Sequence, residues 1–189
     1  LISRTGWSSE LGYEIFLKDG TKGFELWNAI MKSGKPLGLK AGHTSSIRRI
    51  EGGMLSYHAD MTSQNNPYEM GLDRLVDIDK AETFIGKESL MEIRKKGISK
   101  KHVGILLNCP PLKGPNTTFW PIILNEKTIG YITSAVYSPR LKKNIALAMI
   151  SIENSKYSTE ITTIIDEHRV QGSITSIPFF DPKKSITKN

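Results

Sequence analysis

The sequence is poor in cysteine, in long apolar runs and in the motifs of the common nucleotide-binding and hydrolytic enzymes. Its single cysteine, Cys109, excludes an internal disulfide framework and suits a reducing cytoplasm. No apolar run reaches the roughly 18 residues of a membrane-spanning helix, so we expect no membrane partner. The sequence contains no Gly-x-Gly-x-x-Gly fingerprint, no phosphate-binding loop and no Gly-x-Ser-x-Gly elbow. These absences argue against the dinucleotide-binding, phosphate-loop and serine-hydrolase classes.

Metal ligands are also scarce. The four histidines are scattered and show no metal-ligand spacing. His58 and Asp60 come nearest to a ligand pair, but one histidine and one aspartate do not make a zinc site. We expect a hydrogen bond within a loop there instead, and no bound metal.

The positive charge of the sequence is concentrated in its second half. Residues 1–98 hold 14 basic and 13 acidic residues, a net charge of +1, whereas residues 99–189 hold 12 and 6, a net charge of +6. A basic face attracts polyanions such as nucleic acid or an acidic protein. The basic cluster at residues 94–101 lacks an Arg-Gly repeat, a zinc knuckle or a recognition-helix pattern. We therefore expect a solvated helix end there and no nucleic-acid partner, since positive charge is favourable at a helix C-terminus.

The first half of the sequence alternates between short strands and helices. Period-2 alternation predicts a strand at residues 13–17, with Glu14 and Phe16 sharing one face. Apolar residues at helical spacing predict a helix over residues 22–33. A second helix is expected to begin after Thr44, which is an N-cap type of residue, and a third to span residues 87–96.

The second half reads as a series of short strands. Turn signals at Asn125-Glu126-Lys127 and Asp166-Glu167-His168 predict hairpins. Several short strands in succession predict a small antiparallel barrel or sandwich. The fold class is therefore α+β, with a predicted domain at 1–98 and an all-β domain at 99–189. The predicted strands are Val103–Leu107, Phe119–Leu124, Ile129–Val136, Ile145–Ile152, Glu160–Ile165 and Val170–Ile177.

Spaced fragments along the chain carry a family resemblance. They are Ser3–Trp7 with Gly12–Ile15, Arg49–Tyr57, Asn66–Leu72, Phe84–Lys87 and Pro178–Lys184. Their order and spacing resemble the folate-dependent T-protein (aminomethyltransferase) family, which includes the dimethylsulfoniopropionate demethylases. The resemblance implies the C-terminal part of a folate-binding α+β domain, followed by a β-barrel domain. Because it matches the C-terminal half of the family, and the sequence opens in a strand already in progress, we expect a fragment. Catalytic residues are then expected upstream of Leu1.

The resemblance implies three tetrahydrofolate-binding residues. Glu14 matches the family's glutamate that binds the pteridine, whose adjacent N–H donors suit a carboxylate. Trp7 matches an aromatic residue that lines the same pocket. Arg49 matches an arginine associated with the folate cavity, where it could bind a carboxylate of the substrate or of folate. From the residues alone, an exposed strand glutamate, a core aromatic and an ion-paired arginine remain open alternatives.

Departures from the T-protein pattern distinguish two branches of the family. The chain has Thr44-Ser45-Ser46 where T-proteins usually carry Ala-Arg-Asp, and Gly6-Trp7-Ser8-Ser9-Glu10 where they read Gly-Tyr-Thr-Gly-Glu. The tryptophan and the Leu55-Ser56-Tyr57 sequence are closer to the demethylase branch. These differences favour transfer of an intact methyl group over aminomethyl transfer.

The resemblance predicts a tetrahydrofolate-dependent one-carbon transferase in the cytoplasm. The favoured reaction moves a methyl group from a sulfonium such as dimethylsulfoniopropionate to tetrahydrofolate, a displacement that depends mainly on positioning and desolvation. One alternative is a glycine-cleavage aminomethyltransferase acting on a lipoyl carrier protein, which the basic second half could dock. Another is a folate-binding module without transferase activity.

Overall fold

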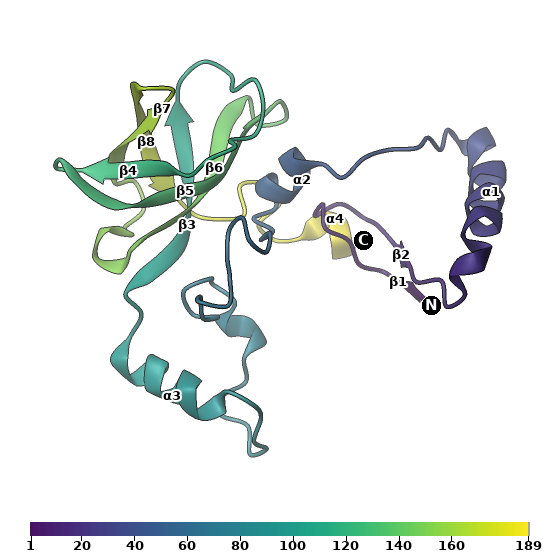
Figure 1. Ribbon diagram of the computed structural model, residues 1–189, viewed down its shortest axis with the longest axis horizontal. Helices are drawn as coiled ribbons and strands as arrows, with labels where there is room; N and C mark the ends of the chain where they lie inside the picture. The colour runs from purple at the N-terminus through teal and green to yellow at the C-terminus, as the bar shows by residue number, and fades with distance from the viewer. Residues whose placement is uncertain (189) are drawn as a thin grey trace.

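The computed structural model describes residues 1–188 and has a closed β-barrel at one end and a helix-bearing N-terminal segment at the other (Figure 1). The predicted α+β class and the antiparallel barrel are both confirmed. All strand pairs of the barrel are antiparallel, in the order β3-β6-β5-β4-β7-β8, and β3 closes the barrel against β8. The six strands are β3 (Lys100–Asn108), β4 (Trp120–Leu124), β5 (Lys127–Ser138), β6 (Lys143–Ser151), β7 (Glu160–Ile165) and β8 (His168–Thr175).

Two tight hairpins in the barrel lie where the turn signals predicted them. Leu124 pairs with Lys127 across the β4–β5 turn, and Asn125 and Glu126 both have positive φ. The β7–β8 turn has the same geometry at Asp166 and Glu167. Two central residues with positive φ match the right-handed twist of the flanking strands, so local chemistry determines both connections.

Alternate residues of the strands fill the barrel. On β3, Val103, Ile105 and Leu107 point inward, and β-branched residues of the other strands complete the interior. Leu106, which lies between two of them, faces outward and packs against a second apolar cluster. That cluster is formed with α2 (Ser46–Glu51), whose Ile50 is almost fully buried. The helix is therefore fixed to the outer wall of the barrel.

Helix α2 begins one residue later than the sequence predicted. Ser45 is its N-cap, and the Ser45 hydroxyl accepts a hydrogen bond from the backbone N–H of Arg48. The predicted cap, Thr44, precedes it. Both residues are good caps, so only the backbone conformation at residue 45, with φ of −103° and ψ of 107°, decides between them.

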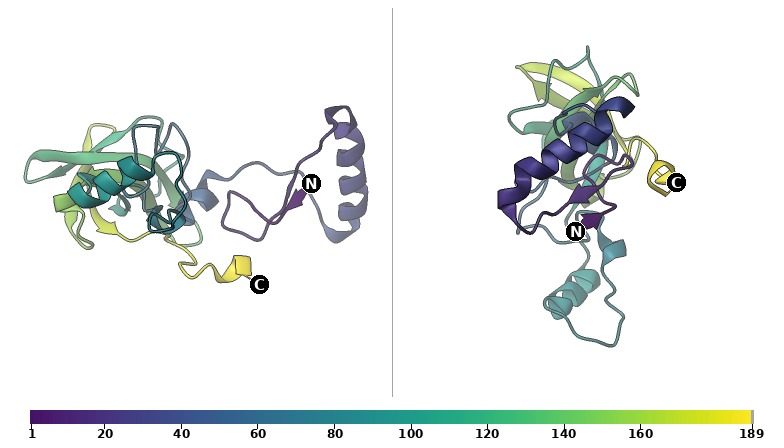
Figure 2. Two further views of the ribbon diagram at one scale, coloured as in Figure 1. Left: turned by 90° about the horizontal axis from the view of Figure 1, so that it is seen from below. Right: turned by 90° about the vertical axis from the view of Figure 1, so that its right-hand side faces the viewer.

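The ribbon and the helix of the N-terminal segment lie away from the barrel (Figures 1 and 2). Its two-stranded ribbon pairs β1 (Ile2–Ser3) with β2 (Glu14–Ile15), shorter than the predicted strand at residues 13–17. A 3₁₀ turn, η1 (Gly20–Lys22), leads into α1 (Gly23–Gly34), which confirms the predicted helix, and η2 (Lys35–Leu37) follows. None of the side chains of α1 is buried, and Phe24 and Trp27 are 77% and 50% exposed.

A central segment joins α2 to the barrel and includes η3 (Asp73–Leu75) and α3 (Lys87–Lys96). Helix α3 has the predicted bounds, and its last turn carries the exposed basic residues Arg94, Lys95 and Lys96. The 3₁₀ turn η4 (Ile152–Asn154) follows β6. After the barrel, the chain returns past α2 and ends in α4 (Ser185–Lys188), whose first backbone N–H groups the Asp181 carboxylate caps.

Candidate functional site

A buried ion pair joins α2 to the segment that follows it. Arg49 Nη1 donates to Asp60 Oδ2 at 2.6 Å, and the side chain of Asp60 is completely inaccessible to solvent. Arg49 also donates to Ser134 Oγ at 2.7 Å and to the carbonyl oxygen of Met54 at 3.3 Å. Asp60 Oδ2 also accepts a hydrogen bond from the backbone N–H of Ser56 at 2.9 Å, so the hydrogen bond expected within this loop is present.

A β-bulge in β5 completes this pair. The β5–β6 register shifts between Ile132 and Ser134, which leaves Thr133 as the additional residue. Both hydroxyls then reach Asp60 Oδ1, from Thr133 Oγ1 at 2.7 Å and from Ser134 Oγ at 2.6 Å. With the backbone N–H of Ser56 at 2.9 Å, the carboxylate of Asp60 accepts four hydrogen bonds. Such saturation is what a buried charge requires.

Trp7 lies against the exposed side of this network. The guanidinium carbon of Arg49 is 5.5 Å from the centroid of the Trp7 ring, which is within cation–π range. Trp7 Nε1 also donates to the carbonyl oxygen of Leu55 at 3.1 Å, and 39% of the residue remains exposed. Two of the three predicted site residues are therefore in contact, and the ring of Trp7 has a fixed orientation with one part open to a ligand.

Glu14 lies on β2 in the ribbon and is exposed. Its Oε2 accepts a hydrogen bond from Thr5 Oγ1. None of the described contacts joins Glu14 to Trp7 or Arg49. The cofactor-binding roles of all three residues stay predictions, but the structure shows what holds each of them.

A second charged cluster ties the N-terminal segment to the barrel. Glu51 is 1% exposed and accepts from Ser138 Oγ at 2.6 Å and from Arg48 at 3.2 Å. Arg140 forms an ion pair with Glu10 at 2.6 Å, and its guanidinium lies 4.0 Å from the centroid of the Phe180 ring. The Ser138-Pro139-Arg140 turn thus connects three parts of the chain that are distant in sequence.

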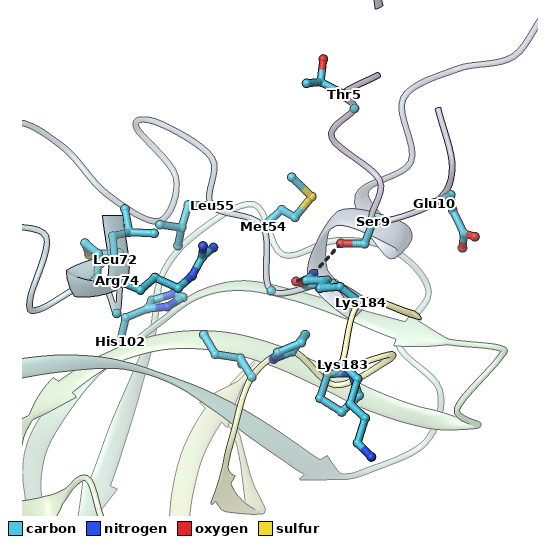
Figure 3. A pocket seen from close by; sticks show the side chains of 18 of the residues that line it. Thr5, Ser9, Glu10, Met54, Leu55, Leu72, Arg74, His102, Lys183 and Lys184 are labelled. Carbon is cyan, nitrogen blue, oxygen red and sulfur yellow. Dashed lines mark hydrogen bonds between the residues drawn. The ribbon is translucent and has the colours of Figure 1, made fainter. Parts of the chain in front are cut away.

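A cavity of about 1170 Å³ opens between the N-terminal segment, the loop after α2, η3 and the chain after β8 (Figure 3). It exceeds the roughly 300–1,000 Å³ usual for small-molecule sites. Thr5, the hydrogen-bond donor to Glu14, lines it, and so do the residues on either side of the Trp7 loop, Gly6 and Ser9. The predicted site residues themselves lie behind or beside its wall.

Close approach of three chain segments shapes the narrow part of the cavity. Lys184 Nζ donates to Ser9 Oγ at 3.1 Å and to the carbonyl oxygen of Gly52 at 3.3 Å. A Cβ at Gly52 would lie 1.9 Å from Ser9 Oγ, and Gly53 has a φ of +64° with Pro178 close by. The Gly52-Gly53 pair is therefore required where these segments meet.

His102 is a cavity residue that sequence reasoning did not identify. It is 3% exposed, and neither ring nitrogen has a hydrogen-bond partner among the described residues. Burial lowers the pKa of His102 to about 4, against a smaller raising effect of Asp60 and with a further lowering by Arg49. The imidazole is neutral at pH 7.

The buried network around Arg49 was also missed. Asp60 was considered only with its neighbour His58, and nothing local connects it to a strand more than 70 residues away. One signal was present, because Thr133 and Ser134 are adjacent hydroxyl residues inside the otherwise apolar run Ile129–Val136. Polar residues in such a run need buried partners.

Two other kinds of site were sought in the described part of the chain. Residues 1–188 contain no group of three or more His, Cys, Asp or Glu side chains that could hold a metal ion. Within the same residues, no helix has the length and apolarity needed to cross a bilayer.

Comparisons with known proteins connect this geometry to one family. Residues 1–80 match the sequence model of the GCVT N-terminal domain, and residues 100–181 match that of the glycine cleavage T-protein C-terminal barrel domain. The chain is 34% identical to dimethylsulfoniopropionate demethylase DmdA of Ruegeria pomeroyi over 79% of this chain and 40% of that protein. It is 35% identical to the aminomethyltransferase of Halothermothrix orenii over 95% of this chain and 49% of that protein.

A solved structure shows the same fold. The crystal structure of glycine cleavage system aminomethyltransferase T from Bartonella henselae matches with a TM-score of 0.79 and 23% identity, over 95% of this chain and 49% of that chain. The present chain spans about half the length of the relatives it matches, or less. Both halves of the described chain match models of one family, so the chain belongs to the glycine-cleavage T-protein (aminomethyltransferase) family and corresponds to its C-terminal half.

Proposed function

We propose that this chain is part of a tetrahydrofolate-dependent one-carbon transferase that moves a methyl group from a sulfonium, such as dimethylsulfoniopropionate, to tetrahydrofolate. The observation that carries the proposal is the placement of Trp7 on the buried Arg49–Asp60 pair, beside a cavity large enough for a folate. The similarity to the Ruegeria pomeroyi demethylase supports the choice of reaction.

The residues present fit tetrahydrofolate. Its pterin edge carries adjacent N–H donors, and the exposed Glu14 carboxylate, steadied by Thr5, can accept them. Trp7 offers a flat ring for the folate to pack against. When bound, tetrahydrofolate supplies the nucleophilic nitrogen that accepts the one-carbon unit.

Arg49 contributes by holding Trp7. Its guanidinium already donates to Asp60, Ser134 and Met54, so we assign it to positioning the indole ring. Apolar residues lining the cavity, such as Met54 and Leu55, exclude water. Methyl transfer from a sulfonium expels a neutral thioether, and a site that positions and desolvates its reactants suits this chemistry.

The N-cap of α2 supports methyl over aminomethyl transfer. Ser45 lies where T-proteins carry the arginine of Ala-Arg-Asp, and its hydroxyl is committed to the backbone N–H of Arg48. The charged side chains of the Ala-Arg-Asp motif are therefore absent here, and the Ser45 hydroxyl caps the N-terminus of α2 instead. A sulfonium donor is compatible with this change, because its thioether leaves without being protonated and the proton that the methylated folate nitrogen loses can pass to water.

Aminomethyl transfer is the second candidate. Aminomethyltransferases at 35% identity match 95% of the chain. The excess of basic residues after residue 98 also suits docking of an acidic lipoyl carrier protein. We further propose that residues 1–98 and 99–189 act as two domains, and that the protein works in the cytoplasm, which the single cysteine suits.

Mass spectrometry of the folate product tests the proposal. The chain would be assayed alone and together with the N-terminal half of the Ruegeria pomeroyi demethylase, because it spans less than half of that relative. Each sample would receive tetrahydrofolate with either dimethylsulfoniopropionate or an aminomethylated lipoyl carrier. Formation of 5-methyl-tetrahydrofolate from the sulfonium supports the proposal. Methylene-tetrahydrofolate from the carrier alone would establish the second candidate, and binding without turnover would indicate a folate-binding module.

Substitution of Glu14 tests the folate site directly. Glu14→Gln removes the negative charge and one acceptor, so we expect tetrahydrofolate affinity to fall by about 10- to 100-fold, the value of a charge-assisted hydrogen bond. Glu25→Gln, on the exposed helix α1, is the matched control and should leave affinity unchanged. Isothermal titration calorimetry measures both. Equal affinities for the two variants would contradict the role of Glu14.

A further inference from the structure

One end of the cavity contains a buried polar group with no partner. His102 lies on the outer face of β3, and its ring nitrogens have no partner among residues 1–188 although the residue is 97% shielded from solvent. Burying such a group without a hydrogen bond costs about 1–3 kcal/mol, and buried polar atoms are almost always satisfied. Since His102 lines the cavity, a ligand can supply the missing partner.

The lining of the whole cavity is strongly basic. Five basic side chains line the cavity and only one acidic side chain, Glu10, does so. Glu10 is already paired with Arg140 at 2.6 Å. The basic residues are Arg4, Arg74, Lys101, Lys183 and Lys184. Fixed positive charge of this kind favours an anionic ligand.

Two of these cations belong to the His102 end. Arg74 comes from η3 and Lys101 directly precedes His102 on β3. Lys183 and Lys184 lie toward the other end of the cavity, where Lys184 contacts Ser9 (Figure 3). Arg74 is exposed and offers a guanidinium fork. Lys101 Nζ lies 5.9 Å from the centroid of the Tyr157 ring, at the cavity wall.

We propose that Arg74, Lys101 and His102 form a carboxylate-binding subsite within the proposed transferase site. The guanidinium of Arg74 would bind the two carboxylate oxygens, and a neutral His102 would donate one N–H to the same group. The inference rests on the proposed function for the identity of the ligand. The carboxylate belongs either to the glutamate part of the folate or to the one-carbon donor.

The electrostatic surroundings of His102 agree with this subsite. The charges of Asp60 and Arg49 in the buried network act on its ring, and the cations Arg74 and Lys101 line the same cavity. Asp60 and Arg49 satisfy each other, so they leave no acceptor for the imidazole. A bound carboxylate adds that acceptor and balances the positive charge of the two cavity cations.

Binding measurements with paired ligands identify the source of the carboxylate. One pair is tetrahydrofolate and its derivative with both glutamate carboxylates amidated; the other is dimethylsulfoniopropionate and its amide. We expect the amidation of one ligand to weaken binding at least tenfold in the unmodified chain. In the Arg74→Gln variant, the unamidated form of this ligand should bind as weakly as its amide. The control variant Lys95→Gln, on α3, should show the same difference between acid and amide as the unmodified chain. Equal binding of acid and amide in both pairs would overturn the subsite.

A second measurement does not depend on folate. Glutarate serves as a simple carboxylate probe, and ¹⁵N NMR at pH 7 follows the ring nitrogens of His102, whose signals are assigned by their absence in His102→Gln. Glutarate should shift these signals in the unmodified chain and not in Arg74→Gln. If glutarate shifts the His102 signals only when Arg74 is present, while neither folate nor the donor binds, the subsite stands and the proposed transferase function fails. Unchanged signals would count against the subsite itself.

Discussion

Removing the carboxylate of Asp60 should severely destabilise the protein. The side chain of Asp60 is fully buried and accepts four hydrogen bonds, one of them from the Arg49 guanidinium. Asp60→Ala would leave a buried arginine charge without its partner, which costs about 3–5 kcal/mol. Domains of ordinary size are stable by only about 5–15 kcal/mol, so this one change should remove a large share of the stability.

The surface ion pair between Arg94 and Asp79 provides the matched control. Its N–O distance is 3.0 Å, but the two side chains are 56% and 81% exposed. Asp79→Ala should therefore change the free energy of unfolding by at most about 1 kcal/mol. A double variant, Arg49→Met with Asp60→Leu, removes both buried charges and should be more stable than Asp60→Ala.

Equilibrium unfolding in urea, followed by circular dichroism and tryptophan fluorescence, measures these differences. The fluorescence signal has a local component, because Trp7 packs on Arg49 and should lose its fixed environment when Asp60 is removed. A loss below about 1 kcal/mol for Asp60→Ala, equal to that of Asp79→Ala, would refute the reasoning. It would mean that, in Asp60→Ala, the Arg49 guanidinium donates to other acceptors or to water without loss of folding free energy.

Two further predictions concern stability. His102 has a folded-state pKa of about 4, below its unfolded value near 6.5, so the unfolded chain takes up the proton first on acidification. Stability should be fully present above about pH 6.5 and fall by roughly 3 kcal/mol toward pH 4; urea unfolding across this range should lose this component in His102→Gln but keep it in His168→Gln. Gly53→Ala places a Cβ at φ +64° and 3.4 Å from Pro178, and should cost about 1–2 kcal/mol. Gly114→Ala, with open space around it, should cost far less when thermal unfolding of the two variants is compared, and equal costs would contradict this account.

Local patterns accounted for most of the secondary structure. The helical spacing of apolar residues predicted α1, and the helix expected over residues 87–96 has the bounds of α3. The two tight turns of the barrel follow from three-residue signals, because positive φ at two central residues is a local requirement. The strand at residues 13–17 was less well predicted, since its ribbon pairs only two residues on each side.

The candidate site was only partly predictable. Trp7 and Arg49 were identified through the family resemblance, and the structure shows why they belong together. Their common support, Asp60 with the hydroxyls of the β5 bulge, could not be found by spacing. A β-bulge is a property of two paired strands, so neither strand alone contains the signal.

The sequence by itself determined the α+β class, the order of strands and helices, the family and the uneven charge. Each of these depends on residue periodicity, turn chemistry or composition, which are local or summed properties. Only the tertiary structure decided that Arg49 is committed to Asp60, and that the ring nitrogens of His102 are buried in a basic cavity without a partner among residues 1–188. Such facts depend on which distant segments meet, because hydrogen-bond partners and desolvation are properties of contacts in space.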